Sequence, residues 1–273
     1  MSGMQGFVDT ERSVLRMAGT DVRDVLQNVV TNDLGRVAPG RAVYAALLTP
    51  QGKYLFDFLL LERPDDSQDG ALLIDCAADR AEALAQRLRM YCLRRDAKIT
   101  GEAGLGVALV WGGEMPEGGF VVPDPRAGAL GWRIYAVDPA AALAAIGAAA
   151  ADRAAYEALR IAHMVPASGV ELVPDETYIL EAGFEALNGV DFRKGCYIGQ
   201  EVTARMRHKT ELKKRLVRVR VEGEAALGTP VTAGGRPAGT LFSQSGGQGL
   251  AHLRLDRAGG VLEAGAARVI YEG

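Results

Sequence analysis

The chain has 273 residues, more than one domain usually contains, so we expect two or three subdomains. Its 31 basic and 34 acidic residues give a formal net charge of -3, which argues against a protein that binds polyanions over its whole surface. The three cysteines, Cys76, Cys92 and Cys196, are far apart and form no C-x-x-C pair. We therefore expect no disulfide framework, no zinc or iron–sulfur site built from this chain alone, and no permanently bound metal.

The first residues, "MSGMQGFVDTERSV", lack the basic start and apolar run of a secretion signal. No segment approaches the roughly 20 apolar residues that a membrane-spanning helix needs. We therefore expect a cytoplasmic protein without a membrane contact.

In chain order, the first predicted elements are a strand over 13–19 and a helix over 20–35 with Thr20 as its N-cap. Two apolar, β-rich runs follow within 42–63. The turn residues at 50–52 predict that these two runs form a hairpin. A polar segment then separates the hairpin from the next strand.

The middle of the chain alternates short strands with a helix, as a mixed α/β subdomain does. The predicted strands are 71–75, 97–101, 106–111 and 132–137, and the predicted helix is 78–92. An alanine-rich tract then predicts helix over 139–164, and Gly147 is a candidate break in it.

The last part of the chain changes character. The run "RLVRVRVEG" alternates apolar and basic residues with period two, which is typical of a strand with one buried face. Glycine-rich turns then separate three further short β-rich runs. The pattern predicts a small antiparallel β unit over 212–273.

One stretch, "DFRKGCYIGQEVTARMRHK" at 191–209, places a cysteine among residues that favour reactivity. Lys194 lies two residues before Cys196 and could lower the pKa of its thiol, because a nearby cation favours the thiolate. Gly195 and Gly199 would let the backbone turn tightly. The alternative interpretation is a buried, inert cysteine.

The run "KGCYIGQEVTAR" resembles the signature of the YgfZ family, folate-binding proteins that assist the assembly or repair of iron–sulfur clusters and have mitochondrial counterparts. The resemblance extends over "LQNVVTNDL", "YAALLTPQGKYLFDFLL", "EALRIAHMVPASGVEL" and "ILEAGFEALNGVDF". That family is similar in fold to the T-protein of the glycine cleavage system, an aminomethyltransferase that uses tetrahydrofolate. The resemblance thus implies an α+β, three-subdomain aminomethyltransferase-like fold, with a central folate pocket and a small C-terminal antiparallel β-barrel.

This fold implies a division of the chain. Residues 1–50 and 150–211 would form a split first subdomain that carries the KGCYIGQE signature. Residues 51–149 would form an inserted α/β subdomain, and 212–273 the C-terminal β subdomain.

The resemblance also implies candidate site residues. Cys196 and Lys194 would carry the chemistry. The candidates for binding tetrahydrofolate or a derivative are Glu181, Arg160, Asn32, Asp33, Asp57, Gln200 and Arg205.

Each folate candidate has a structural alternative. Glu181 suits the pterin, because a carboxylate accepts its adjacent N–H donors, and Glu185 is the second choice. Arg160 and Arg205 could equally be surface ion-pair residues. Asn32 and Asp33 could be ordinary turn residues, and Gln200 could hold the turn at Cys196. Asp57 is the one acid in "GKYLFDF", where the aminomethyltransferases that the chain resembles carry an acidic pair.

The segment 205–220 is strongly basic, with eight Lys or Arg residues against the single acid Glu211. This excess could meet an acidic protein or RNA phosphates. The segment has no aromatic residue for stacking on bases, so RNA is not the expected partner. A solvated strand edge protected by charge is the structural alternative.

We therefore predict a tetrahydrofolate-binding accessory protein for assembly, maintenance or repair of iron–sulfur clusters, with Cys196 beside the folate. Its expected partners are iron–sulfur assembly proteins or client enzymes. The first alternative is a folate-dependent aminomethyltransferase, for which the incomplete acidic pair is a difficulty. The second is a non-catalytic module that binds RNA or an acidic protein through the basic segment.

Overall fold

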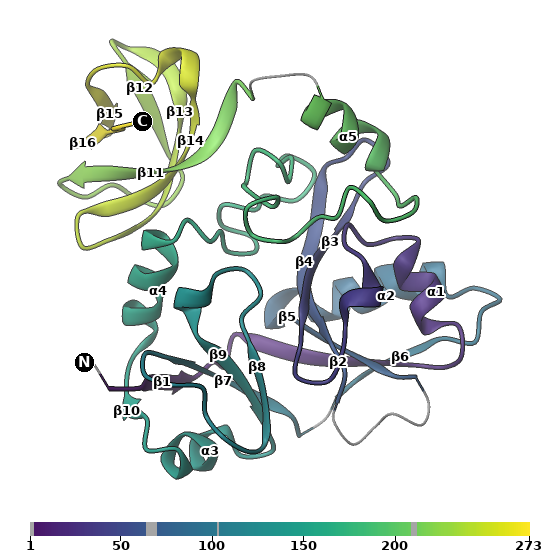
Figure 1. Cartoon of the computed structure of the whole chain (residues 1–273). Coiled ribbons are helices and arrows are strands. Elements are labelled where there is room, and N and C mark those ends of the chain that lie inside the picture. The colour runs from purple at the N-terminus through teal and green to yellow at the C-terminus, as the bar shows by residue number, and fades with distance from the viewer. Residues whose placement is uncertain (1–2, 64–69, 103, 209–211) are drawn as a thin grey trace.

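The computed structural model describes residues 3–63, 70–102, 104–208 and 212–273. Figure 1 shows two β-sheets, a separate barrel, and a long irregular segment between them. No helix of the described residues is long and apolar enough to cross a membrane.

The first sheet is antiparallel and has the order β3-β4-β5-β2-β6. Its strands are β2 (Arg12–Ala18), β3 (Val43–Leu48), β4 (Tyr54–Leu61), β5 (Leu72–Ala77) and β6 (Lys98–Gly101). Helices α1 (Val22–Gln27) and α2 (Ala81–Tyr91) bury their apolar residues against one face of this sheet.

The hairpin β3–β4 is buried over its whole length. Along β3, Tyr44 and Ala46 enter one hydrophobic core, whereas Ala45 and Leu47 enter the other. A strand with both faces covered carries a continuous apolar run instead of an alternating one. This confirms the predicted hairpin, whose turn includes Gly52 at a φ of 75°.

The second sheet has the order β10-β1-β7-β9-β8 and carries α3 (Pro139–Ala145) on one face. Its strands are β1 (Gln5–Val8), β7 (Gly106–Trp111), β8 (Phe120–Pro123), β9 (Trp132–Ala136) and β10 (Ala149–Ala150). Short 3-10 helices lie at η1 (Leu34–Arg36), η2 (Ala78–Arg80), η3 (Gly128–Leu130) and η4 (Leu255–Arg257).

A buried polar network joins the two sheets. The carboxylate of Asp75 on β5 accepts hydrogen bonds from Arg12 Nε at 2.6 Å, Arg133 Nη1 at 2.8 Å and Tyr135 Oη at 2.8 Å. Arg133 and Tyr135 belong to β9, and Arg133 also contacts Asp124 at 3.1 Å. Because buried charges must be paired, these contacts fix how the sheets meet.

From the second sheet the chain passes through α4 (Arg153–Ala162), an irregular segment over 163–199, and α5 (Gln200–His208). It then forms a closed barrel of order β11-β14-β13-β12-β15-β16. The barrel strands are β11 (Lys214–Glu222), β12 (Thr229–Ala233), β13 (Arg236–Ser245), β14 (Gln248–Arg254), β15 (Leu262–Ala264) and β16 (Ala267–Ile270).

The barrel confirms the alternation read from the sequence. Val217, Val219 and Val221 are buried in the barrel core, whereas Arg218 and Arg220 are exposed. The barrel is closed because β11 pairs with both β14 and β16. Closure removes the free edges of an open sheet.

One predicted helix is shorter in the structure, and a second is broken at the glycine that the sequence indicated. The helix expected over 20–35 ends at Gln27, since Thr31 then donates its backbone N–H to Ala46 O on β3. Thr20 does not cap it, because its hydroxyl donates to Asp96. The alanine-rich tract divides into α3 and α4 at Gly147, which has a φ of 66°.

The division into subdomains stays a prediction. The strands β3 and β4 pair across the predicted boundary at residue 50, so one sheet contains residues from both sides of it. In the second sheet, β1 from the predicted first subdomain pairs with β7 from the predicted inserted subdomain.

Candidate functional site

The loop that carries Cys196 is held firmly at both ends. At its start, Asp191 accepts a hydrogen bond from the Arg193 backbone N–H at 2.7 Å and pairs with Arg36. At its end, Gly199 has a φ of 84°, and a Cβ there would lie only 2.6 Å from Thr49 O. The side chain of Cys196 itself is exposed, so a fixed backbone presents an accessible thiol.

Lys194 points inward from this loop. It is only 8% exposed, and its ammonium donates to Gln27 O at 2.7 Å and Val30 O at 2.6 Å. Burial lowers its pKa to about 8, although Asp33 and Asp191 favour the charged form. These contacts tie the cysteine loop to the end of α1. The predicted effect of Lys194 on the Cys196 thiol stays a prediction.

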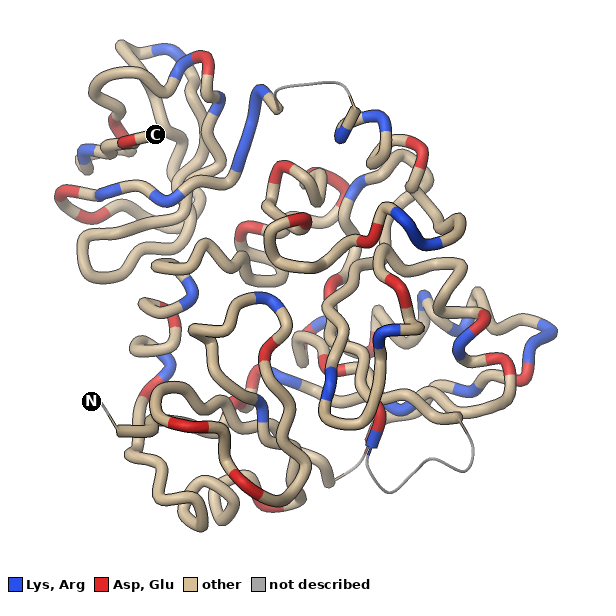
Figure 2. The backbone as a smooth tube through the Cα atoms, viewed as in Figure 1, with Lys and Arg blue, Asp and Glu red and all other residues tan. Residues whose placement is uncertain are grey.

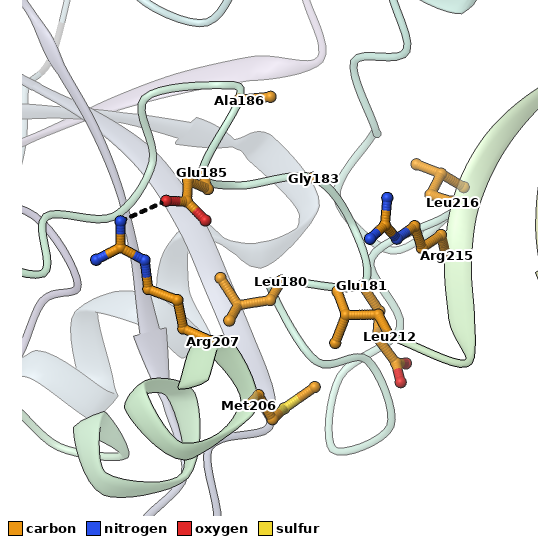
Figure 3. A pocket seen from close by; sticks show the side chains of 10 residues that line it. All are labelled: Leu180, Glu181, Gly183, Glu185, Ala186, Met206, Arg207, Leu212, Arg215 and Leu216. Carbon is orange, nitrogen blue, oxygen red and sulfur yellow. Dashed lines mark ion pairs between the residues drawn. The ribbon is translucent and has the colours of Figure 1, made fainter. Parts of the chain in front are cut away.

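Glu181 lies in a cavity of about 590 Å³, which we call the Glu181 cavity (Figure 3). Its backbone oxygen accepts a hydrogen bond from Leu216 N at 2.7 Å, which ties the cavity wall to β11. Burial raises the pKa of the Glu181 carboxyl, and Lys214 and Lys53 offset part of this rise. The apolar side chains that line the cavity include Leu180, Met206, Leu212 and Leu216.

The same cavity holds further charged groups. Glu185, the second choice for the pterin, forms an ion pair with Arg207 at 2.9 Å (Figure 3). Arg215 also lines the cavity. It therefore combines carboxylates, arginines and apolar surface.

Asp57 lies elsewhere, at the meeting point of the two sheets and α4. Its carboxylate is 5% exposed and accepts hydrogen bonds from Tyr44 Oη at 3.0 Å, Tyr54 Oη at 2.7 Å and Ser168 Oγ at 2.5 Å. The cavity beside it holds about 100 Å³. Pockets for ligands of drug size are about 300–1,000 Å³, so this one has room for a small ion or a few waters.

Arg160 lies at this same centre and is 4% exposed. It pairs with Glu157 at 2.6 Å and Glu171 at 3.2 Å, and donates to Ser243 on β13. These contacts join α4 to the barrel. Sequence spacing did not indicate this role, because Ser243 is 83 residues away in the chain.

Asn32 and Asp33 form the turn between α1 and β3. Asn32 Nδ2 donates to Tyr44 O at 2.8 Å and Asn188 O at 2.6 Å. Asp33 accepts from Gly35 N at 3.0 Å, and this hydrogen bond lowers its pKa. Both side chains thus serve the local backbone.

Gln200 and Arg205 both belong to α5, a helix that the sequence did not indicate. The Gln200 backbone N–H donates to Tyr197 O at 3.2 Å, and Arg205 pairs with Glu201 at 2.6 Å one turn earlier. The cysteine loop precedes α5, and Met206 near the other end of α5 lines the Glu181 cavity. At about 1.5 Å per residue, roughly 9 Å of helix separates Gln200 from Met206.

The predicted folate residues thus fall into four places: the Glu181 cavity, the centre beside Asp57, the turn at Asn32, and α5. The sequence reading missed Arg207 and Arg215 as cavity residues, since both were counted only within the basic segment. The apolar residues spaced through that segment were the available signal. Lys209 and Glu211 of the segment lie outside the described residues.

Neither of the other cysteines is presented like Cys196. Cys76 is buried, and burial raises its pKa to about 12, whereas Cys92 is half-buried at the end of α2. Among the residues that the structure describes, no three His, Cys, Asp or Glu side chains gather as metal ligands.

Known proteins resemble this chain in sequence and in fold. Residues 213–272 match the family model described as CAF17, C-terminal beta-barrel domain. The glycine cleavage system aminomethyltransferase T from Bartonella henselae superimposes with a TM-score of 0.79 over 98% of this chain and 84% of its own, at 15% identity. This similarity confirms the α+β aminomethyltransferase-like fold with its C-terminal barrel.

Two curated relatives match nearly the whole sequence. The iron-sulfur cluster assembly factor IBA57, mitochondrial, of Mus musculus is 32% identical over 92% of this chain and 78% of its own length. The Homo sapiens protein of the same name is 31% identical over 94% and 79%. Their names place them in mitochondria, so the prediction of a cytoplasmic protein is contradicted. The chain belongs to the family of the iron–sulfur cluster assembly factor IBA57.

Proposed function

We propose that this chain assists the assembly or maintenance of iron–sulfur clusters in client enzymes, as a YgfZ-like protein, and that Cys196 is the group that meets the cluster. The relatives that match over nine-tenths of the chain are named iron–sulfur cluster assembly factors. The observation that carries the residue assignment is the exposed Cys196 on a loop fixed at both ends.

Cys196 acts as one thiolate ligand to iron or to a cluster in transit. The thiol loses its proton when it binds iron, since the thiolate is the ligand form. Iron–sulfur clusters usually take four cysteine ligands. The remaining ligands therefore come from a partner, which is an assembly protein or the client enzyme.

We further propose that tetrahydrofolate or a derivative binds in the Glu181 cavity. The Glu181 carboxylate would accept the adjacent N–H donors of the pterin, and the apolar side chains would cover its ring. Arg215 would hold a carboxylate of the glutamate tail. When bound, the folate would supply a reduced pterin at the far end of α5 from Cys196.

The volume supports this cavity over the centre beside Asp57, because about 590 Å³ lies in the usual range for a ligand pocket and about 100 Å³ does not. Asp57 already accepts three hydrogen bonds from hydroxyl groups. Its lone pairs are therefore largely engaged, which gives the aminomethyltransferase alternative no support.

The test is rescue of cells that lack their own factor of this family. Cells receive the wild type, Cys196→Ser, or Cys92→Ser as the matched control, and one iron–sulfur enzyme and one enzyme without a cluster are assayed. We expect the wild type and Cys92→Ser to restore the iron–sulfur enzyme and Cys196→Ser to fail. Full restoration by Cys196→Ser would remove the cysteine from the mechanism.

A further inference from the structure

A second cavity, of about 690 Å³, shares Glu181 with the first. It lies between the barrel strands β13 and β14, the segment 173–181, and the turn between β3 and β4. We call it the basic groove. Its charged residues are the cations Lys53, Lys213, Lys214, Arg254 and Arg257 and the carboxylates Glu176 and Glu181. Figure 2 shows the blue run of Lys and Arg where the chain enters β11.

Some of these cations already have partners. Arg254 pairs with Asp256 at 3.0 Å, Lys53 Nζ donates to Glu176 O at 2.7 Å, and Arg257 donates to Pro237 O at 2.7 Å.

Lys213 and Lys214 differ from them. Both are exposed, and within the described part of the chain neither ammonium has an ion pair or a hydrogen bond. The positive charge of Lys214 acts on Glu181 and on His252. These two lysines therefore leave the groove with uncompensated positive charge next to Glu181.

His252 supplies a second sign of a polar ligand. Its Nε2 is buried, has no hydrogen-bond partner among the described residues, and lies 3.9 Å from Glu181 Oε2. That distance is too long for a direct hydrogen bond. Burial, followed by the charge of Lys214, lowers the His252 pKa to about 4, so the ring is neutral at physiological pH. A buried polar atom of this kind is normally satisfied.

We propose that the basic groove binds the oligo-γ-glutamate tail of a polyglutamylated folate whose pterin occupies the Glu181 cavity. This inference rests on the proposed folate site. Each added γ-linked glutamate brings one more carboxylate, and an ammonium group donates strong hydrogen bonds to such a group. The tail leaves a folate at the end opposite the pterin edge, where Arg215 would hold its first carboxylate. Lys214 and Lys213 directly precede Arg215 in the chain and line the groove, so the further glutamates would meet these two lysines.

The tail also explains the distribution of charge. The Glu181 cavity offers carboxylates to the N–H donors of a pterin, and the groove offers Lys213 and Lys214 to a chain of anions. A folate with a single glutamate would leave most of the groove unused. The protein should therefore prefer the longer forms.

The experiment is calorimetric titration of the whole chain with tetrahydrofolate monoglutamate and tetrahydrofolate pentaglutamate. The proteins are the wild type, Lys213→Glu/Lys214→Glu, and the control Arg94→Glu/Lys98→Glu. The control reverses two exposed charges that lie outside both cavities. Titrations at about 0.05 M and about 0.3 M salt separate screened contacts from buried ones.

We expect the wild type and the control to bind the pentaglutamate roughly tenfold more tightly at low salt, and this preference to shrink at higher salt. Lys213→Glu/Lys214→Glu should lose the preference and bind the pentaglutamate no more tightly than the monoglutamate, although the charge reversed at Lys214 acts on Glu181 and weakens the binding of both. Equal affinity of the wild type for both ligands would overturn the tail site and leave the folate site standing. A preference for the pentaglutamate that survives in Lys213→Glu/Lys214→Glu would also overturn the tail site and leave the folate site standing. Binding of neither ligand would refute the folate site itself, and the tail site with it.

Discussion

Replacing Lys194 with methionine tests whether this residue fixes the cysteine loop. Its ammonium donates to Gln27 O and Val30 O, at 2.7 and 2.6 Å. Methionine keeps most of the apolar stem and removes both donors. Leaving a buried carbonyl without a partner costs about 1–3 kcal/mol, and water can reach the half-buried Gln27 more easily than Val30. The cost of burying an ammonium offsets part of this, so we expect a net loss of about 2 kcal/mol in the free energy of unfolding.

The assay is urea denaturation, with Lys53→Met as the matched control. Lys53 also donates one hydrogen bond to a backbone oxygen, at 2.7 Å, but in an exposed position. The Lys53 ammonium also lies 3.5 Å from the centre of the Tyr178 ring, so replacing Lys53 should cost about 1 kcal/mol, less than replacing Lys194. Amide hydrogen exchange over residues 191–199 should accelerate only in Lys194→Met. A Lys194→Met protein as stable as the wild type would refute the anchoring role.

The Lys194→Met variant also tests how the stability of the protein depends on pH. Burial lowers the pKa of Lys194 from 10.5 to about 8. Between these values the unfolded chain holds the proton and the folded chain has released it, so the stability of the wild type rises with pH. The methionine variant lacks this gain. The stability difference between the two proteins should therefore widen from pH 7 to about pH 9.5.

Two further predictions concern Glu181, and a third concerns the contact between the sheets. Glu181→Gln should weaken tetrahydrofolate binding by about ten- to a hundredfold, since hydrogen bonds to a charged acceptor are worth about 1.5–3 kcal/mol. An unchanged affinity in calorimetric titration would show that the pterin does not bind at Glu181. Because burial raises the Glu181 pKa, wild-type affinity should fall on acidification at a higher pH than for an ordinary glutamate, and a flat profile down to about pH 4.5 contradicts this. Asp75→Asn should lower the free energy of unfolding by about 3–5 kcal/mol, because Arg12 loses its buried counter-ion and Arg133 keeps only Asp124. A loss below about 1 kcal/mol in thermal denaturation would count against the network.

The local pattern of apolar and polar residues predicted the strands in which buried residues are continuous or alternate with exposed ones. The hairpin β3–β4 and the alternating strand β11 follow from runs of apolar residues and from period two, and the structure has both. Pairing between distant strands was not predictable in this way. For example, β1 pairs with β7 about 100 residues later, and no local signal specifies that register.

Helix α5 was missed because its sequence is mostly polar and reads as part of a glycine-rich turn. The closed barrel and the overall fold were predicted from the resemblance to the YgfZ family. That resemblance depends on sequence motifs and not on the periodicity of apolar residues.

The site shows the same limit. The motif indicated Cys196, and the structure presents its thiol at the surface. Sequence spacing put Lys194 two residues from Cys196, but it could not say that the ammonium points inward to Val30. Likewise, the hydroxyl of Ser168 reaches Asp57 across 111 residues of chain. Contacts of this kind are set by tertiary packing. Candidate site residues chosen from the sequence can therefore lie in different parts of the folded chain.

The central claim is that Cys196 serves cluster assembly in client enzymes. The most direct measurement is the iron and acid-labile sulfide content of one client enzyme, purified from cells that lack their own factor and carry either the wild type or Cys196→Ser. The account predicts a filled cluster with the wild type, and with Cys196→Ser a client present in equal amount but largely without iron and sulfide. A client with full iron and sulfide content in the Cys196→Ser cells would contradict it.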